Sequence, residues 1–428
     1  MNILVVSEAF DNGGLETQIK TYYESLPRNV KMIFAFGKYT EKIKLDNAKI
    51  FTGFNFSYID TIKEFCEDVN RLVEIIKKEK IDAIHVHPYY SFFAAYFASQ
   101  ITNRNLFYTF HGISSFNFLK TPISQAIFQY AFDSIGVASV LSVSNDGINC
   151  FKSFPYSKAI LLPNPINLQK FPIAQIKNNR HWALISRLDS DKVTEIKLLI
   201  KNMKKYKIKK LDIFGSGSET ENLKSYLLEN KLNKDVNFMG YSYNLYQDLN
   251  NKYNGVIGIG RVLLETLSMG YPTILIGYNK VTGFVNMDIF NKIKNNNFSN
   301  INLNEENYNF PNSKEMVQIR DEIRNNYNSE IITAKYLDII KNNMSTFKQN
   351  IKDLYAEIEL LNRNDEINIC SFHKERMLYN LIYKYIGKYT LDPKTYNIFV
   401  NTNLNYELFD IMSMRVLEMK GMIENEKN

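Results

Sequence analysis

Residues 255–276 read GVIGIGRVLLETLSMGYPTILI, and this stretch decides the class of fold. An apolar run, Gly255–Ile259, ends in a Gly-x-Gly turn, and the turn enters a helical pattern that runs to Met269 and Gly270. A second apolar run, Thr273–Ile276, follows at once. A strand, a helix and a further strand in this order are typical of a parallel sheet that helices cover on both faces.

The same alternation extends from Asn2 to about Tyr278. Amphipathic patterns between the apolar runs predict helices, for example over Thr17–Leu26, Ile62–Ile76, Lys197–Met203 and Glu219–Leu228. There are enough runs for two sheets, so we expect an α/β fold with two parallel sheets. The other apolar runs are Ile3–Val6, Val30–Ala35, Ala83–Val86, Leu106–Thr109, Val140–Val143, Ala159–Leu162, Trp182–Ile185, Leu211–Phe214 and Val236–Phe238.

Two polar stretches suggest domain boundaries. Pro163-Asn164-Pro165 and the polar residues that follow interrupt the alternation of apolar runs and helical patterns. An Asn-rich connector spans Asn295 to Asn312. Helical patterns follow this connector with almost no strand signal. We therefore predict an N-terminal α/β domain, a second α/β domain, helices that pack back on the core, and a helical extension, over 1–165, 166–312, 313–345 and 346–428 respectively.

Composition excludes several classes of protein. A chain of 428 residues predicts two or three domains, and 45% hydrophobic with 23% charged residues excludes wholesale disorder. The net charge of +7, from 52 Lys plus Arg against 45 Asp plus Glu, favours an anionic substrate or surface. No repeat of a size typical of solenoids is visible.

The cysteines and the apolar runs bear on the compartment. Cys66, Cys150 and Cys370 are far apart and form no C-x-x-C pair, which favours free thiols in a reducing cytoplasm. Ile3–Val6 is too short for a signal peptide, and no run has the roughly 20 apolar residues of a membrane span. We expect a cytoplasmic protein whose membrane contact, if any, is peripheral and at the inner face of the cell membrane.

Two loops that follow predicted strands are suited to anions. Gly13 and Gly14 follow the first strand and lead into a helix, although an ordinary strand-to-helix turn is an open alternative. Arg187 and Lys192 follow the strand Trp182–Ile185, and two cations at this spacing can face one diphosphate. The alternative for this second loop is a solvated surface in which Asp189 and Asp191 pair with the two cations.

The Gly-x-Gly turn at Gly258–Gly260 carries a third possible site. It lacks the third glycine of a dinucleotide fingerprint, but it offers bare backbone at a helix N-terminus and a cation in Arg261. One turn further on, Glu265 could accept hydrogen bonds from the vicinal hydroxyls of a ribose. The alternative is an acid that merely stabilises the start of the helix.

The histidines give a weaker signal. His111 lies at a strand end before a glycine, where it could donate to substrate hydroxyls or serve only as a structural residue. His85 and His87 share one strand face, but no third ligand lies near them in sequence, so we predict no metal site. A lysine run over residues 201–210 is interpreted as a solvated helix face. The next alternative is contact with an anionic membrane surface, and the last is contact with nucleic acid.

The order of these motifs resembles the retaining GT-B glycosyltransferases of family 4, which use nucleotide-activated sugars. The resemblance covers roughly residues 1–345. Besides the Gly-Gly turn, Thr109-Phe110-His111-Gly112, Arg187 to Lys192 and Gly258 to Glu265, it includes Asp82-Ala83-Ile84-His85-Val86-His87, Val143-Ser144, Leu162-Pro163-Asn164-Pro165, Phe214-Gly215-Ser216-Gly217, Val236-Asn237-Phe238-Met239-Gly240 and Gly270-Tyr271-Pro272.

The resemblance implies two Rossmann-like domains that face across a donor cleft, with named roles for residues of this chain. Arg187 and Lys192 would neutralise the donor diphosphate, and His111 would hydrogen-bond the transferred sugar. Glu265 would hold the ribose hydroxyls. The remaining donor contacts implied are Gly13, Gly14, Gly215, Met239, Gly260, Arg261, Val262 and Leu263.

One position departs from the family pattern. In the pattern E-x(7)-E, the first acid faces the sugar, and Ile257 stands in its place; the residue after the second glycine is Arg261. The resemblance still implies a retaining, metal-independent hexosyltransferase with no permanent cofactor. A catalytically silent GT-B partner or chaperone of another transferase is the alternative that Ile257 motivates.

The expected partners follow from the same resemblance. The donor would be a nucleotide-diphosphate sugar, in the first place a UDP-sugar. The acceptor would be a glycan, a lipid-linked group or a protein in the synthesis of a bacterial cell-surface polysaccharide, teichoic acid or glycoconjugate. Self-association through the C-terminal helices is left open, and no nucleic-acid partner is expected.

Overall fold

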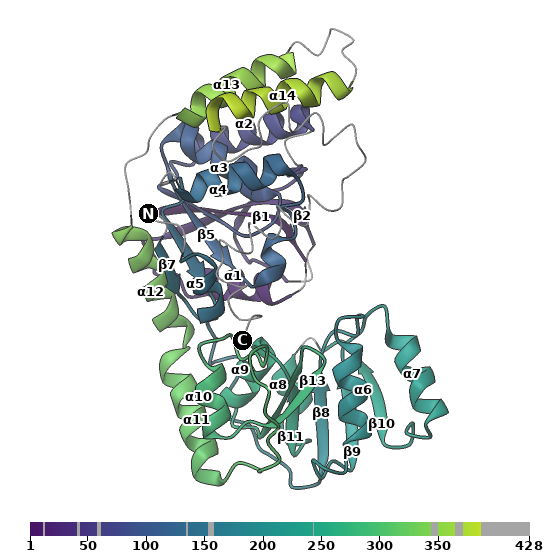
Figure 1. Cartoon of the computed structure of the whole chain (residues 1–428). Helices are drawn as coiled ribbons and strands as arrows, with labels where there is room; N and C mark the ends of the chain where they lie inside the picture. The colour runs from purple at the N-terminus through teal and green to yellow at the C-terminus, as the bar shows by residue number, and fades with distance from the viewer. Residues whose placement is uncertain are drawn as a thin grey trace. The chain divides into compact units, whose positions relative to one another are not determined.

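The computed structural model describes residues 1–386, except 12, 41–42, 58–60, 134–135, 153–157, 243, 344–349 and 364–370 (Figure 1). The chain divides into two compact units. Met1–Leu162 and Thr333–Asn428 form the first unit, and Pro163–Ile332 forms the second. Part of the predicted extension, residues 387–428, lies outside the described residues.

The first unit contains a seven-stranded parallel sheet in the order β3-β2-β1-β4-β5-β6-β7. The order runs outward in both directions from the first strand, as in a doubly wound fold. The strands are β1 (Asn2–Phe10), β2 (Lys31–Tyr39), β3 (Lys49–Phe51), β4 (Ala83–Val86), β5 (Asn105–Phe110), β6 (Ser139–Ser142) and β7 (Lys158–Leu161).

Helices pack on this sheet. They are α1 (Gly14–Glu24), α2 (Ile62–Lys78), α3 (Ser91–Thr102), the 3-10 turn η1 (Ile113–Phe116), α4 (Pro122–Asp133), α5 (Asn145–Cys150), α12 (Ser329–Asn342), α13 (Asn350–Arg363) and α14 (Ser371–Ile386). Of these, α13 and α14 pack on other helices. Every residue of α3 from Ser91 to Gln100 is buried, since α2, α4 and α13 enclose it. This explains why α3 is apolar all round.

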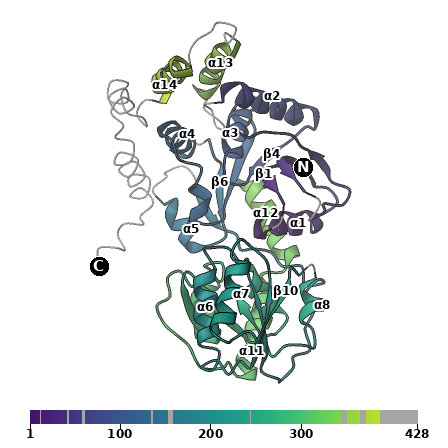
Figure 2. The same cartoon turned by 90° about the vertical axis from the view of Figure 1, so that its right-hand side faces the viewer.

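The two helices α13 and α14 belong to the first unit. Figures 1 and 2 show them over α2, α3 and α4, and their apolar residues continue the core of that unit. The Tyr355 hydroxyl contacts Asn70 Oδ1 at 3.0 Å, and Lys352 Nζ donates to Asn103 Oδ1 at 2.8 Å. The predicted C-terminal helical extension is confirmed as far as Ile386.

The second unit contains a six-stranded sheet in the order β10-β9-β8-β11-β12-β13. The first five strands of this order are parallel, and β13 is antiparallel to β12. The strands are β8 (His181–Ile185), β9 (Lys210–Phe214), β10 (Val236–Gly240), β11 (Gly255–Gly258), β12 (Thr273–Gly277) and β13 (Lys280–Phe284).

The helices of this unit are α6 (Val193–Lys201), α7 (Thr220–Glu229), α8 (Leu245–Leu249), α9 (Arg261–Ser268), α10 (Met287–Ile293) and α11 (Ser313–Asn326). Residues 255–276 fold as β11, α9 and β12, so the predicted strand, helix and parallel strand are confirmed. The α/β class with two largely parallel sheets is confirmed with them. None of the helices in the described part of the chain is both long and apolar enough to cross a membrane.

The Asn-rich stretch after residue 295 is more than a connector. The Asn300 side chain is fully buried and donates to Gly277 O at 3.1 Å and to Thr282 Oγ1 at 3.0 Å. Asn307 exchanges hydrogen bonds with Phe284, from Phe284 N to Asn307 O and from Asn307 Nδ2 to Phe284 O. The side-chain amides of Asn300 and Asn307 therefore donate to Gly277 O and Phe284 O at the β12–β13 edge, and an apolar side chain would not supply these donors.

Candidate functional site

Three loops meet at the carboxyl edge of the second sheet. They follow β9, β8 and β11, which are neighbours in that order. Because carboxyl ends of parallel strands share one edge, Arg187, Gly215 and Gly260 come from adjacent strand ends. The predicted residues of the second unit are therefore gathered by the topology itself.

The loop after β8 is anchored to the loop after β9. The Leu188 side chain is fully buried, Leu188 N donates to Ser216 O at 3.1 Å, and Glu219 N donates to Leu188 O at 2.8 Å. Gly215 has φ +141°, and a Cβ there would lie 1.8 Å from Ser186 O. Gly215 thus permits the close approach of the two loops, and this contact positions Arg187.

We predict that Gly215→Ala lowers the free energy of unfolding by about 2 kcal/mol or more, since it combines a strained φ with a clash against backbone that cannot rotate away. Urea denaturation measures this loss. Gly14→Ala is the matched control, because nothing lies within 4 Å of a Cβ at Gly14. Equal stability of the two variants would contradict the role of Gly215 in joining the loops.

Arg187 and Lys192 have acidic neighbours within their own loop. Arg187 pairs with Asp189 at 2.7 Å and with Asp191 at 3.4 Å, and Lys192 Nζ lies 3.3 Å from Asp191. The ion pairs expected for a solvated surface loop, the alternative to a diphosphate site, are therefore present. The Arg187 side chain is 66% exposed, and such pairs contribute only about 0 to 1 kcal/mol, so a diphosphate could displace them.

The start of α9 has an unusual backbone. Gly260 is the N-cap with φ +61°, a conformation that favours glycine, and its N–H donates to Phe298 O at 3.0 Å. Its N–H is thus engaged within the protein, so an anion at this turn would have to meet the N–H groups that follow. The Leu263 side chain is buried in the core, and Val262 is half-buried.

Arg261 and Glu265 form an ion pair one turn apart on α9. Arg261 Nε donates to Glu265 Oε1 at 2.8 Å, and each side chain is only 12% exposed. Burial raises the pKa of the Glu265 carboxyl, and the Arg261 charge opposes that shift. The predicted phosphate ligand and the predicted ribose ligand are therefore partners of each other, with one carboxylate oxygen engaged.

Two other positions bear on the resemblance. Ile257 is fully buried in β11, beside Leu184 of β8 and Ile274 of β12, so an apolar core residue occupies the place of the family acid. Met239, near the end of β10, has an exposed fraction of 51%, and Tyr241 has 46%. Both are open to contact with an apolar or aromatic ligand.

The histidines of the first unit form hydrogen bonds between the neighbouring strands β4 and β5 or just beyond the ends of these strands, and to α12. His87 Nδ1 lies 3.0 Å from His111 Nε2, and His85 Nε2 lies 2.6 Å from Thr109 Oγ1. His85 Nδ1 lies 2.9 Å from the hydroxyl of Tyr336 on α12. His85 and His87 are buried, and His111 is half-buried at the carboxyl edge of the sheet.

Burial lowers the pKa of all three imidazoles. The pKa of His85 falls to about 3, that of His111 to about 4, and that of His87 lies well below its usual value. All three are therefore neutral at pH 7, and a neutral imidazole both donates and accepts. No group of His, Cys, Asp and Glu in the described residues could hold a metal ion.

These shifts predict an acid-sensitive first unit. A histidine whose pKa is lowered by folding binds its proton more readily in the unfolded chain, so stability is full above about pH 6.5 and falls as pH drops toward 4. Because His85 is protonated at pH 5 in the unfolded chain and not in the folded one, lowering the pH from 7 to 5 should reduce the free energy of unfolding by about 2 kcal/mol. Denaturation at both pH values should show a smaller loss for His85→Gln than for the wild type, and an equal loss would contradict the assignment.

The Gly13-Gly14 turn lies at the same carboxyl edge, before α1. Gly13 is the N-cap in an extended conformation, and a Cβ on it would lie 2.8 Å from Glu16 Oε2. Gly14 has open space around it. Burial raises the pKa of Glu16 and of nearby Glu8, whose carboxylate accepts from Tyr90 N at 3.0 Å. Acids and neutral histidines thus share this edge.

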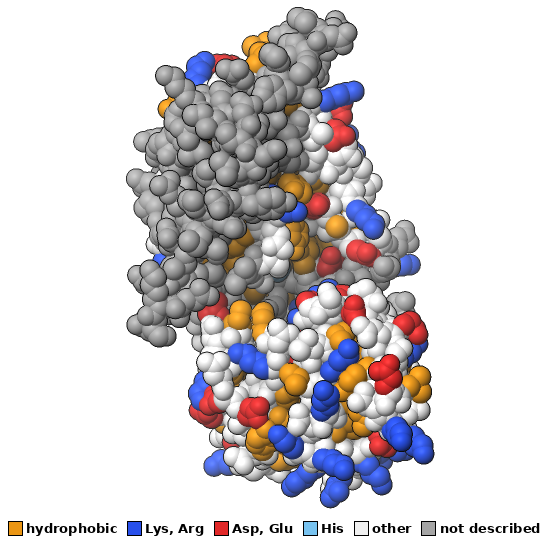
Figure 3. All heavy atoms as spheres, turned by 45° about the vertical axis from the view of Figure 1, so that its right-hand side comes forward, with side chains coloured by type: hydrophobic (Ala, Val, Ile, Leu, Met, Phe, Trp, Pro, Cys, Tyr) orange, Lys and Arg blue, Asp and Glu red, His pale blue; other side chains and the backbone are white. Residues whose placement is uncertain are grey.

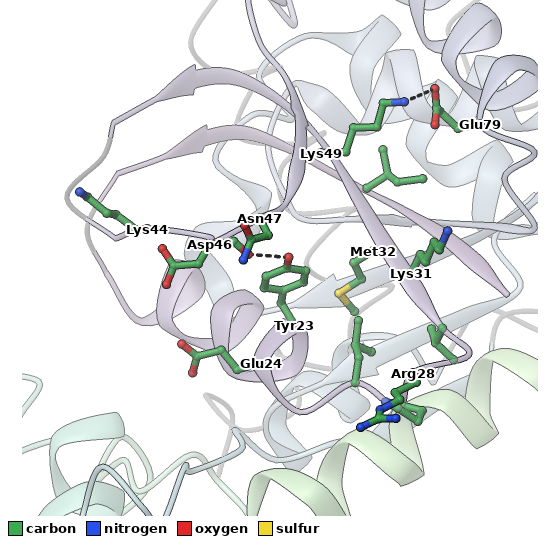
Figure 4. Close-up of a pocket in the computed structure, with 14 residues that line it drawn as sticks. Tyr23, Glu24, Arg28, Lys31, Met32, Lys44, Asp46, Asn47, Lys49 and Glu79 are labelled. Atoms are coloured by element: carbon green, nitrogen blue, oxygen red, sulfur yellow. Dashed lines mark hydrogen bonds and ion pairs between the residues drawn. The ribbon is translucent and has the colours of Figure 1, made fainter.

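A hollow of about 740 Å³ lies elsewhere in the first unit (Figure 4). Lys31 and Lys49, the first residues of β2 and β3, line it, so it lies at the amino ends of these strands. Lys49 pairs with Glu79 at 2.7 Å, and the Tyr23 hydroxyl donates to Asp46 O at 2.8 Å. None of the predicted site residues lines this hollow.

The two sheets and their helices define the class of fold. Two doubly wound, largely parallel α/β units with these elements form the GT-B fold of glycosyltransferases. Residues 12–170 match the family model described as Glycosyltransferase Family 4. This match covers less than half of the chain, and no curated protein matches the chain in sequence.

Several solved glycosyltransferases share the fold. Anabaena HepE in complex with UDP is 14% identical with a TM-score of 0.60, and 80% of this chain aligns with 100% of that one. Sucrose-phosphate synthase from Thermosynechococcus elongatus is 15% identical with a TM-score of 0.59, over 80% of this chain and 98% of that one. The lipopolysaccharide outer core galactosyltransferase WaaB in its apo form is 16% identical with a TM-score of 0.57, over 80% and 99%.

Proposed function

We propose that this protein is a glycosyltransferase that transfers a sugar from a nucleotide-diphosphate donor to an acceptor hydroxyl. The observation that carries the proposal is the placement of Arg187 and Lys192 in the loop after β8 and of Glu265 in α9, the helix that follows β11, because β8 and β11 are hydrogen-bonded parallel strands. This edge offers cations for a diphosphate beside a carboxylate for hydroxyl groups. The likeness to structures that bind UDP or UDP-glucose supports a UDP-sugar as donor.

In the proposed reaction, the main task of the protein is to hold cations beside the leaving group. The bond between the anomeric carbon and the diphosphate oxygen breaks, and its electron pair leaves with the diphosphate. Arg187 and Lys192 stabilise the negative charge that develops on this leaving group. The acceptor oxygen bonds to the anomeric carbon on the same face and passes its proton to the leaving phosphate, which gives retention of configuration without a separate base or a metal.

The resemblance supports further assignments. We propose that His111 hydrogen-bonds the transferred sugar and that His87 holds the His111 ring through their 3.0 Å contact. Gly13 and Gly14 would lie against the donor or acceptor, and Met239 would flank the base. We also propose a cytoplasmic location with an acceptor from cell-surface polysaccharide, teichoic acid or glycoconjugate synthesis.

Donor turnover tests the proposal. The full chain is incubated with UDP-, GDP- and ADP-sugars, and release of the nucleoside diphosphate is followed together with the shift in melting temperature. We expect one class of donor to raise the melting temperature and to be slowly hydrolysed even without acceptor. If a donor binds but is never turned over with any acceptor, the protein is the catalytically silent partner that Ile257 motivates and not an enzyme. If no donor binds, both proposals are contradicted.

A further inference from the structure

Eleven cations gather at the amino edge of the second sheet, on the side opposite the loops described above. They lie on four segments that precede β8, β9, β10 and β11, over residues 177–180, 201–210, 230–235 and 251–254. We call these four segments the basic edge. Its cations are Lys177, Arg180, Lys201, Lys204, Lys205, Lys207, Lys209, Lys210, Lys231, Lys234 and Lys252.

Hydrogen bonds to backbone carbonyls join the four segments into one surface. Lys209 N donates to Arg180 O at 2.9 Å, and Asn179 Nδ2 donates to Lys252 O at 3.0 Å. At the third junction, Leu211 N, at the start of β9, donates to Asp235 O at 2.8 Å. The cations are therefore neighbours by topology, although they lie up to 75 residues apart in sequence.

The charge of this edge is almost entirely positive. Asp235 is its one acid, so its formal charge is 11 − 1 = +10, against +7 for the whole chain. All eleven side chains belong to exposed residues, and none of them forms an ion pair within the described part of the chain. Lysines elsewhere in the same unit do find acids, as Lys224 does with Glu221 and Lys292 with Asp288.

This arrangement differs from an ordinary solvated face. Along residues 203–209 the lysines point outward while Met203, Tyr206 and Ile208 are buried, which fixes the charged side chains on one side. Figure 3 shows Lys and Arg side chains gathered along the bottom of the view. Concentrating this many like charges costs free energy unless a polyanion neutralises them.

We propose that the basic edge docks on an anionic lipid bilayer. Ten of its eleven cations are lysines, which suit a diffuse surface potential better than the bidentate recognition of single phosphates. Ile173 and Ile176, just before the edge, are 51% and 38% exposed and could enter the interfacial layer. The proposal is independent of the glycosyltransferase activity, because it uses none of the residues assigned to the donor.

The observations disfavour nucleic acid as the partner. Stacking platforms for bases need exposed aromatic rings. The aromatic residues of the edge, Tyr206 and Tyr253, are each 2% exposed. A bilayer with anionic headgroups requires only the charge that this edge presents.

Vesicle sedimentation tests the proposal with the full chain. Vesicles of phosphatidylcholine alone are compared with vesicles that contain about 30% phosphatidylglycerol, at about 0.1 M salt where screening is moderate. We expect binding to the anionic vesicles alone. The fourfold variant Lys204→Gln, Lys205→Gln, Lys207→Gln and Lys209→Gln should lower the partition coefficient at least about tenfold, since four cations no longer attract the anionic surface.

A matched variant controls for total charge. Lys63, Lys77, Lys78 and Lys80 are exposed residues of the first unit, and their replacement by Gln removes the same charge. This variant should bind anionic vesicles nearly as well as the wild type, and both variants should melt at the wild-type temperature. Absence of wild-type binding, or equal losses in the two variants, would overturn the proposal. Tighter binding of single-stranded DNA than of anionic vesicles would also overturn it, in favour of a nucleic-acid surface.

Discussion

Arg187→Ala and Lys192→Ala should each lower kcat/KM for the donor by at least about 30-fold. The figure corresponds to about 2 kcal/mol of transition-state stabilisation, the lower range of what one electrostatic contact to a developing charge supplies. Steady-state release of the nucleoside diphosphate measures it. Because the loss concerns the leaving group, kcat should fall more than KM rises.

Two variants serve as controls for these cations. Arg104, which precedes β5 in the first unit, and Lys314, on α11, are exposed residues that are not assigned to the donor site, and their replacement by alanine should leave kcat/KM within about twofold. The folded state should tolerate Arg187→Ala well, since its ion pairs with Asp189 and Asp191 are exposed and weak. Unchanged turnover in both Arg187→Ala and Lys192→Ala would remove the diphosphate assignment.

Glu265→Ala should impair both stability and donor binding. It leaves the charge of Arg261 without its 2.8 Å partner at a site only 12% exposed, and the loss of one partner of a buried pair costs about 3 kcal/mol of unfolding free energy. It also removes the carboxylate proposed to hold the ribose hydroxyls. The KM for the donor should therefore rise by about tenfold or more.

The double variant Arg261→Ala with Glu265→Ala separates these two effects. Removing both charges should recover part of the stability that Glu265→Ala loses, because the buried Arg261 charge is removed together with its carboxylate partner. Donor affinity should not recover, since the carboxylate is still absent. If the double variant regained full donor affinity, Glu265 would be a structural partner of Arg261 and not a donor ligand.

The parts of the fold that could be predicted are those with strong periodicity. The strands and helix of residues 255–276 have apolar runs separated by a glycine turn and a proline, so their types were clear. The antiparallel strand β13 was missed because it follows a two-residue turn at Tyr278 and Asn279, both with positive φ. Tyrosine is an uncommon residue in such a turn, so the hairpin has no recognisable signal there.

The sequence predicted which residues are candidates for the site better than it predicted which of them contact one another. The Asp partners of Arg187 followed from the loop sequence, and the spacing of Arg261 and Glu265 by four residues could have indicated their ion pair. The contact between His87 and His111 could not be derived in this way. It requires that β4 and β5 be neighbours in the sheet, which is a property of the tertiary fold and not of either segment.

A crystal structure of the full chain with a bound nucleoside diphosphate tests the central claim most directly. We predict that the diphosphate lies within hydrogen-bond distance of Arg187 and Lys192, with the ribose on Glu265 and the terminal phosphate at the first turn of α9. A nucleotide bound elsewhere, for example at the basic edge, with these three side chains still in their own ion pairs, would contradict the account.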